Sequence, residues 1–172
     1  MAHQLSNGAL LSIDVQQGSR LLANLLPQTT KTQYRGMVAT HQALVSAFSQ
    51  SGQLAVIVTD VPPFLRQNGW FGRSLLEGEE GTDLLRLQKP TPSAFAHTDL
   101  AARLRSRGIT DLFVCGFVAE DGVLNTVKDA VALGFSVTVI RDATIARNAK
   151  GRARSFAQFP RVSTTDEVLA LL

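Results

Sequence analysis

The feature that most constrains the fold is a set of short apolar runs that have few polar residues on either alternate face. There are four of them, at Ala9–Val15, Leu54–Thr59, Leu112–Val118 and Ser136–Ile140. A strand with one face in water alternates polar and apolar residues, whereas a strand of a parallel sheet is covered by helices on both sides. The runs therefore predict strands of a mostly parallel sheet with helices on both faces.

Segments with helical spacing separate these runs, and they lie at Lys31–Ser51, His97–Arg107, Asp121–Leu133 and Asp166–Leu172. Glycine follows three of them, which is typical of helix C-termini, and Thr165 can cap the last one. The alternation predicts an α/β fold, a three-layer doubly wound sandwich with a Rossmann-like, mostly parallel sheet of about six strands. A chain of 172 residues fits one such unit, so we expect residues 1–172 to form a single domain.

Composition excludes several classes of protein. Hydrophobic residues make up 45% and charged residues 18%, which is typical of a globular domain. No apolar run reaches the roughly 20 residues of a membrane helix, and the start lacks a secretory pattern, so a cytoplasmic location is expected. The net charge is +3, and the basic residues are dispersed except for Arg147, Lys150, Arg152, Arg154 and Arg161. A basic face in water is commoner than a nucleic-acid site, so we expect small anions rather than nucleic acid or membrane as partners.

The cysteine and histidine content gives little sign of redox or metal chemistry. Cys115 is the only cysteine, so no intramolecular disulfide can form, and no Cys/His spacing of a structural zinc site is present. Because Cys115 falls inside an apolar strand, we expect a small buried hydrophobe rather than a nucleophile. His41 and His97 fall on predicted helices, where structural or solvated roles are expected. We expect no metal and no cofactor.

The topology gathers polar residues at one edge of the sheet. Ligands of open parallel sheets bind beyond the carboxyl ends of the strands, where Asp14, Asp60 and the turn Phe117–Gly122 are expected, together with Lys89. The stretch from Asp60 to Lys89 is long for a connection and carries the only tryptophan, Trp70. A segment of this length is usually an active-site cover or an interface arm.

Four segments in the same order resemble the isochorismatase-like hydrolase family of the cysteine hydrolase superfamily. They are LLSIDVQ, KPTPSAF, GFVAEDGVLNTVKDAVALGFSVTVIRDA and RVSTTDEVLALL, and the likeness runs from about Ala9 to the end of the chain. The resemblance implies a catalytic set built on Asp14 and Lys89. Most members add a nucleophilic cysteine, and counting through GFVAEDG places Gly122 at its position. The resemblance therefore implies a member without the thiol.

A second branch, the isochorismatases proper, is similar to this chain and also has glycine at that position. Its reaction, hydrolysis of a vinyl ether, requires an acid and no thiol. The resemblance assigns the proton to Asp14, with Lys89 orienting it and binding substrate charge. It also implies a cis peptide between Phe117 and Val118. The candidate substrate-binding residues are Gln16, Trp70, Phe95, Phe117 and Val118, although Gln16 could instead be a rim residue and Trp70 and Phe95 core or interface residues.

Two hypotheses of different class remain open. One is a hydrolase that acts on a small carboxylated molecule, such as the vinyl ether isochorismate, through Asp14 and Lys89. The other is a catalytically inactive family member that keeps the pocket for binding or the fold for oligomerisation. The retained acid and ammonium favour the first hypothesis, because facing charges in a closing pocket are costly without a use. Altered flanking residues, VQQGS and Pro90–Pro92, favour the second.

The resemblance also bears on metals and assembly. The nicotinamidase-like branch carries a metal-binding Asp-x-His after the second strand, and this chain has Asp60 but Pro62 in place of the histidine. We therefore expect no metal. The family commonly forms dimers or larger assemblies, so a homodimer or higher homo-oligomer is expected, with the 60–89 segment and its aromatic residues Phe64, Trp70 and Phe71 as the candidate interface arm.

Overall fold

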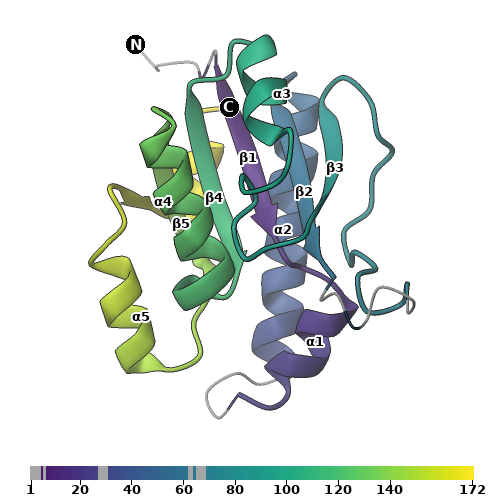
Figure 1. Cartoon of the computed structure of the whole chain (residues 1–172), viewed down its shortest axis with the longest axis vertical. Helices are drawn as coiled ribbons and strands as arrows, with labels where there is room; N and C mark the ends of the chain where they lie inside the picture. The colour runs from purple at the N-terminus through teal and green to yellow at the C-terminus, as the bar shows by residue number, and fades with distance from the viewer. Residues whose placement is uncertain (1–4, 6, 27–30, 62–63, 65–68) are drawn as a thin grey trace.

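The computed structural model describes residues 5, 7–26, 31–61, 64 and 69–172. A six-stranded sheet runs through the molecule in the order β3-β2-β1-β4-β5-β6, and every neighbouring pair is parallel (Figure 1). The strands are β1 (Gly8–Ile13), β2 (Leu54–Asp60), β3 (Leu84–Lys89), β4 (Asp111–Phe117), β5 (Ser136–Ile145) and β6 (Val162–Ser163). The order reverses between β1 and β4, so the predicted doubly wound α/β fold is confirmed.

Helices cover both faces of this sheet, with α3 and α4 in front of it and α2 behind it in Figure 1. The helices are α1 (Gln17–Ala23), α2 (Lys31–Gln50), α3 (Leu100–Ser106), the π-helical turn η2 (Ala119–Val123) that leads into α4 (Leu124–Ala132), α5 (Ala149–Phe156) and α6 (Thr165–Leu169). Side-chain caps fix two helix starts. Asn148 accepts a hydrogen bond from the Gly151 N–H, and Thr164 forms a capping box with Glu167.

The sheet separates two hydrophobic cores. In β1, Ala9, Leu11 and Ile13 pack toward α3 and α4, while Leu10 packs toward α2, and all four side chains are fully buried. This burial on both faces explains why the strand shows no polar alternation in the sequence. No helix in the described parts of the chain combines the length and apolar character needed to cross a membrane.

The structure corrects three sequence predictions. The 60–89 stretch contains strand β3, and its sequence LLRLQK escaped detection because an edge strand is half exposed and carries polar residues. Helix α3 begins at Leu100, so His97 lies in a turn with φ of 59° rather than on a helix. Thr164, not Thr165, caps the last helix.

Strands β1 and β4 meet closely at their carboxyl ends. Gly116 has φ of 142°, and a Cβ at this position would lie 2.1 Å from the carbonyl oxygen of Ile13. Only glycine permits that approach. It sets the turn after β4 directly beside the residue that follows β1, which is Asp14.

Candidate active site

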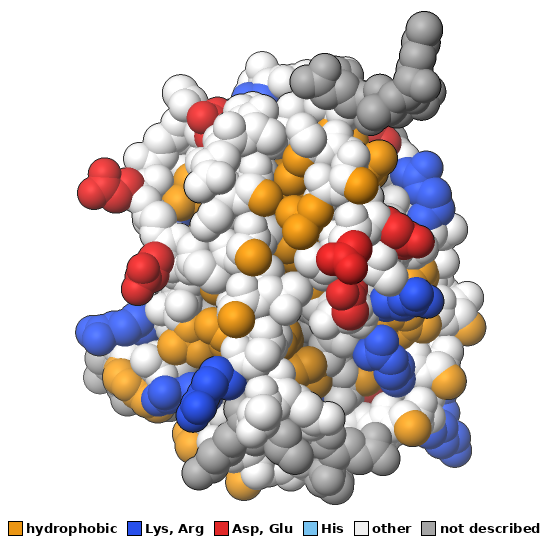
Figure 2. All heavy atoms as spheres, turned by 180° about the vertical axis from the view of Figure 1, so that it is seen from behind, with side chains coloured by type: hydrophobic (Ala, Val, Ile, Leu, Met, Phe, Trp, Pro, Cys, Tyr) orange, Lys and Arg blue, Asp and Glu red, His pale blue; other side chains and the backbone are white. Residues whose placement is uncertain are grey.

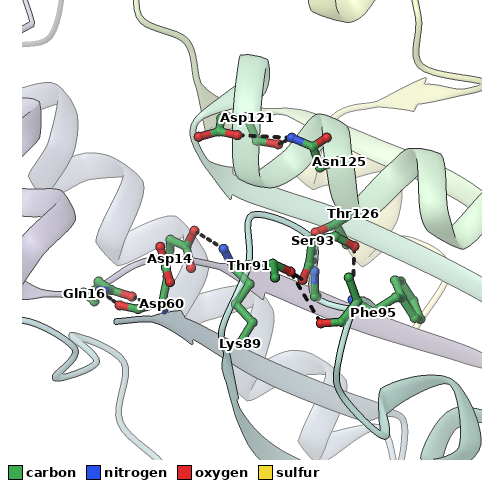
Figure 3. A network of polar contacts seen from close by, with 12 residues as sticks. Asp14, Gln16, Asp60, Lys89, Thr91, Ser93, Phe95, Asp121, Asn125 and Thr126 are labelled. Carbon is green, nitrogen blue, oxygen red and sulfur yellow. Dashed lines mark hydrogen bonds and ion pairs between the residues drawn. The ribbon is translucent and has the colours of Figure 1, made fainter. Parts of the chain in front are cut away.

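An acid and an amine meet beyond the carboxyl ends of the strands. Asp14 follows β1 and Lys89 ends β3, and Lys89 Nζ lies 2.9 Å from Asp14 Oδ2 (Figure 3). Asp14 adopts a left-handed conformation with φ of 56°, which aspartate tolerates better than most residues, and its N–H donates to the Val58 carbonyl. The Lys89 side chain is 1% exposed and that of Asp14 is 11% exposed. The pair is therefore almost fully withdrawn from water.

Burial decides the ionisation of Asp14. It raises the pKa of this carboxyl from 3.8 to about 7, although the Lys89 ammonium acts in the opposite direction. The charges of Asp60 and Asp121 raise the pKa of Asp14 further. The second oxygen, Oδ1, is buried and has no hydrogen-bond partner among the described residues. Near neutral pH this carboxyl can hold a proton and can also release it.

Gly122 leaves room for the Asp14 carboxylate. A Cβ on Gly122 would lie 2.9 Å from Asp14 Oδ2 and 3.2 Å from both Ile13 Cγ2 and the Phe117 carbonyl oxygen. Gly122 lies in η2, directly beyond β4, and is buried. A side chain at this position would therefore press against the carboxyl that contacts Lys89.

A pocket of about 370 Å³ opens over this group. Its polar lining consists of Asp14, Gln16, Ser19, Asp60, Lys89, Asp121 and Arg147, and its apolar lining includes Leu22, Leu25, Leu26, Phe71, Pro92, Phe117 and Val118 beside Gly122. The charged groups of this lining are three carboxyls, Asp14, Asp60 and Asp121, and two cations, Lys89 and Arg147. The volume falls within the usual range for small-molecule sites.

Gln16 holds the ends of two strands together. Its amide nitrogen donates to the Asp60 carbonyl over 2.6 Å and to the Phe71 carbonyl over 3.2 Å, and its amide oxygen accepts from the Asp60 N–H over 2.8 Å. The side chain lines the pocket but is 2% exposed. The hydrogen bonds of the Gln16 side chain thus fix the position of Asp60. Burial raises the pKa of Asp60, which the Lys89 charge lowers in part.

The predicted substrate-binding residues separate into two groups. Phe117 and Val118 line the pocket. The peptide bond between them is cis, so the predicted cis peptide is confirmed. Phe95 instead lies in the core, 7% exposed, with its ring stacked on Phe135 at 5.8 Å. Trp70 lines a different pocket, on the other side of α1. The structure therefore brings neither Phe95 nor Trp70 to the pocket of Asp14.

Cys115 lies in the core, as the sequence predicts. It is fully buried, and burial raises the pKa of its thiol. Its Sγ is 3.7 Å from His41 Nδ1, which also lies 2.7 Å from Ser12 Oγ, while His41 Nε2–H donates to the Ala143 carbonyl. Burial lowers the pKa of His41 to about 4, so this ring is neutral and structural.

Pro62 lies outside the described residues, and within the described ranges no group of three or more His, Cys, Asp or Glu side chains could hold a metal ion.

Arg147 and Asp121 form an ion pair at 3.6 Å on the pocket wall. Arg147 follows β5 in sequence, and the rule that strand ends carry ligand-binding residues could have found it.

Comparison with known proteins identifies the family. The family model described as Isochorismatase domain matches residues 8–167, and the chain belongs to the isochorismatase family of hydrolases. A probable inactive nicotinamidase of Arabidopsis thaliana is 32% identical over 173 residues, covering 85% of this chain and 84% of the relative.

Two solved structures resemble the fold closely. An isochorismatase family protein from Burkholderia thailandensis has a TM-score of 0.81 and 26% identity, with 99% of each chain covered. An isochorismatase from Pseudomonas putida has a TM-score of 0.78 and 26% identity, with 95% of this chain and 91% of that one covered.

Proposed function

We propose that this protein is a hydrolase that works without a thiol and cleaves the vinyl ether of a small carboxylated molecule such as isochorismate. The observation that carries the proposal is the Asp14 carboxyl, which has a pKa of about 7, lines the pocket and contacts Lys89. A general acid works best when its pKa lies near the working pH. The likeness to the isochorismatase from Pseudomonas putida supports the same chemistry.

Gly122 occupies the position at which the cysteine hydrolases carry their nucleophile. A covalent route would therefore need another thiol, and the only cysteine is Cys115. That thiol is fully buried in the sheet and has a raised pKa, so it is neither accessible nor ionised. Amide hydrolysis through a thioester is accordingly excluded from the proposal.

The proposed reaction begins with proton transfer from Asp14 to the terminal carbon of the vinyl ether. The C=C bond becomes a C–C single bond, and the neighbouring carbon becomes an oxocarbenium ion. Water adds to that carbon and loses a proton, which returns to the Asp14 carboxylate. The resulting hemiketal then breaks the C–O bond to the leaving alcohol. Its hydroxyl proton passes to the leaving oxygen, so a ketone and an alcohol are released, one water molecule is consumed and the acid is regenerated.

Lys89 serves both states of this acid. The ammonium at 2.9 Å stabilises the carboxylate that forms when the proton leaves, and it limits the rise of the pKa that burial causes. The substrate carboxylate then requires a different cation. Arg147 lines the same pocket and is half exposed, so its guanidinium is accessible for such a pairing.

A second candidate function is binding without turnover. The Arabidopsis thaliana relative carries the description of a probable inactive nicotinamidase, which favours an inactive member that retains the pocket. Homo-oligomer formation, a cytoplasmic location and the preference for small-molecule partners stay predictions in either case.

The decisive experiment compares wild type with Asp14→Asn for pyruvate release from isochorismate. Loss of a general acid should lower turnover by about 10²- to 10⁴-fold. Asp99→Asn is the matched control, because Asp99 is exposed on the surface and pairs only with Arg103 among the described residues. Circular dichroism would verify that each variant is folded. Saturable isochorismate binding with no pyruvate release from wild type would refute the hydrolase and support the binding function.

A further inference from the structure

A second pocket, separate from that of Asp14, lies behind α1. Its volume is about 460 Å³, and its lining includes the cations Arg20 and Arg35 and the aromatic residues Tyr34 and Trp70. Helix α1 forms the partition between the two pockets, because Arg20 and Leu21 line this one while Ser19 and Leu22 line the other. We propose that this second pocket binds a small aromatic carboxylate.

The charge of the pocket favours an anion. Arg20 and Arg35 are both exposed at its rim, and neither forms an ion pair with an acidic side chain in the described parts of the chain. Figure 2 shows blue Lys and Arg side chains around orange hydrophobic ones at the lower left of this face. Guanidinium groups bind carboxylates through paired, charge-assisted hydrogen bonds.

The walls favour a flat apolar body. Trp70 and Tyr34 contribute aromatic rings, and Leu21, Val38 and Leu75 contribute aliphatic surface. Trp70 is 41% exposed and Leu21 is 51% exposed, which is unusual for large apolar side chains on a surface that stays in water. Aromatic rings and arginines in one concave surface together match a ring that carries a carboxylate.

Tyr34 connects this pocket to the candidate active site. Its O–H donates to the Gln16 carbonyl over 3.3 Å, and its ring packs edge-on against Phe117 at 6.1 Å between centroids. Gln16 and Phe117 both line the pocket of Asp14. A ligand in the second pocket would thus contact the reverse side of the wall that shapes the first.

Trp70 provides a direct readout because it is the only tryptophan in the chain. We expect benzoate to change its fluorescence saturably, and benzamide, a neutral molecule of similar shape, to bind at least about tenfold more weakly. The double variant Arg20→Gln/Arg35→Gln should weaken benzoate by at least about tenfold as well. Arg147→Gln removes the arginine of the other pocket and should leave the Trp70 titration within about twofold of wild type.

Several results would overturn the proposal. Equal affinity for benzoate and benzamide would show that the arginines do not select an anion. Weaker binding in Arg147→Gln but not in the double variant would place the ligand beside Asp14. A Trp70 signal that depends on protein concentration instead of benzoate, together with a dimer in light scattering that the double variant lacks, would identify the pocket as a contact between two copies of the chain.

Discussion

A pair of glycine-to-alanine substitutions isolates the close approach of Gly122 to Asp14. Both Gly122 and Gly36 lie in helical segments, η2 and α2 respectively. A Cβ on Gly36 would meet nothing within 4 Å, whereas one on Gly122 would lie 2.9 Å from Asp14 Oδ2. The two substitutions therefore share a gain in helix propensity and differ in steric crowding.

The magnitudes follow from these contacts. Alanine in place of glycine favours a helix by about 1 kcal/mol, so Gly36→Ala should raise the free energy of unfolding by about 0.5–1 kcal/mol. Adding a methyl group to a packed interior costs about 1–3 kcal/mol. Asp14 Oδ2 is held by Lys89, so it cannot move aside without losing that contact. Gly122→Ala should consequently be less stable than Gly36→Ala by about 1–3 kcal/mol, because the propensity gain largely cancels.

Urea unfolding followed by circular dichroism measures both values, and pyruvate release from isochorismate measures the effect on the acid. We expect Gly36→Ala to retain wild-type turnover and Gly122→Ala to lose most of it, since the methyl group displaces the Asp14 carboxyl from Lys89. Two variants of equal stability and equal turnover would show that the space at Gly122 has no part in placing the acid.

Four further predictions concern individual side chains. Turnover should fall as pH rises through about 7, because Asp14 loses its proton there. In a pH–rate profile of Lys89→Met this fall should occur at higher pH, because the Lys89 ammonium lowers the pKa of Asp14 in wild type. His41 is neutral in the fold, with a pKa of about 4 against 6.5 when exposed, so its stabilising effect is complete above pH 6.5 and is lost toward pH 4. Urea unfolding of wild type should therefore show that the free energy of unfolding falls by roughly 3 kcal/mol over this range because of His41. His41→Gln should not show this fall. Gln16→Met leaves the Asp60 N–H without its partner and should lower the free energy of unfolding by about 1–3 kcal/mol in the same assay. Cys115→Ala should keep full turnover, and a thiol-alkylating reagent should leave the turnover of wild type unchanged. Inhibition of wild type by that reagent, with Cys115→Ala unaffected, would contradict the proposed thiol-free mechanism.

Local pattern was sufficient for most of the fold and for Asp14, and the resemblance to the family was needed for Lys89. Strands β1, β2 and β4 carry few polar residues because helices cover both sides of the sheet, so their sequences alone reveal them. The apolar residues of SVTVI likewise reveal the first half of β5. The carboxyl ends of the strands then locate Asp14, and the family's motifs add Lys89. The cis peptide between Phe117 and Val118 followed from the same motifs.

Contacts between distant segments decided the rest. Strand β3 is defined by its pairing with β2 rather than by its own composition. The Gln16 side chain holds two strand ends together because Asp60 lies within hydrogen-bond distance of it. Phe95 and Trp70 are both large aromatic residues, so the sequence does not distinguish their roles. In the fold Phe95 packs in the core, whereas Trp70 lines a second pocket. The proton on Asp14 depends on burial outweighing the Lys89 ammonium, and a balance of desolvation against charge exists only once the chain has folded.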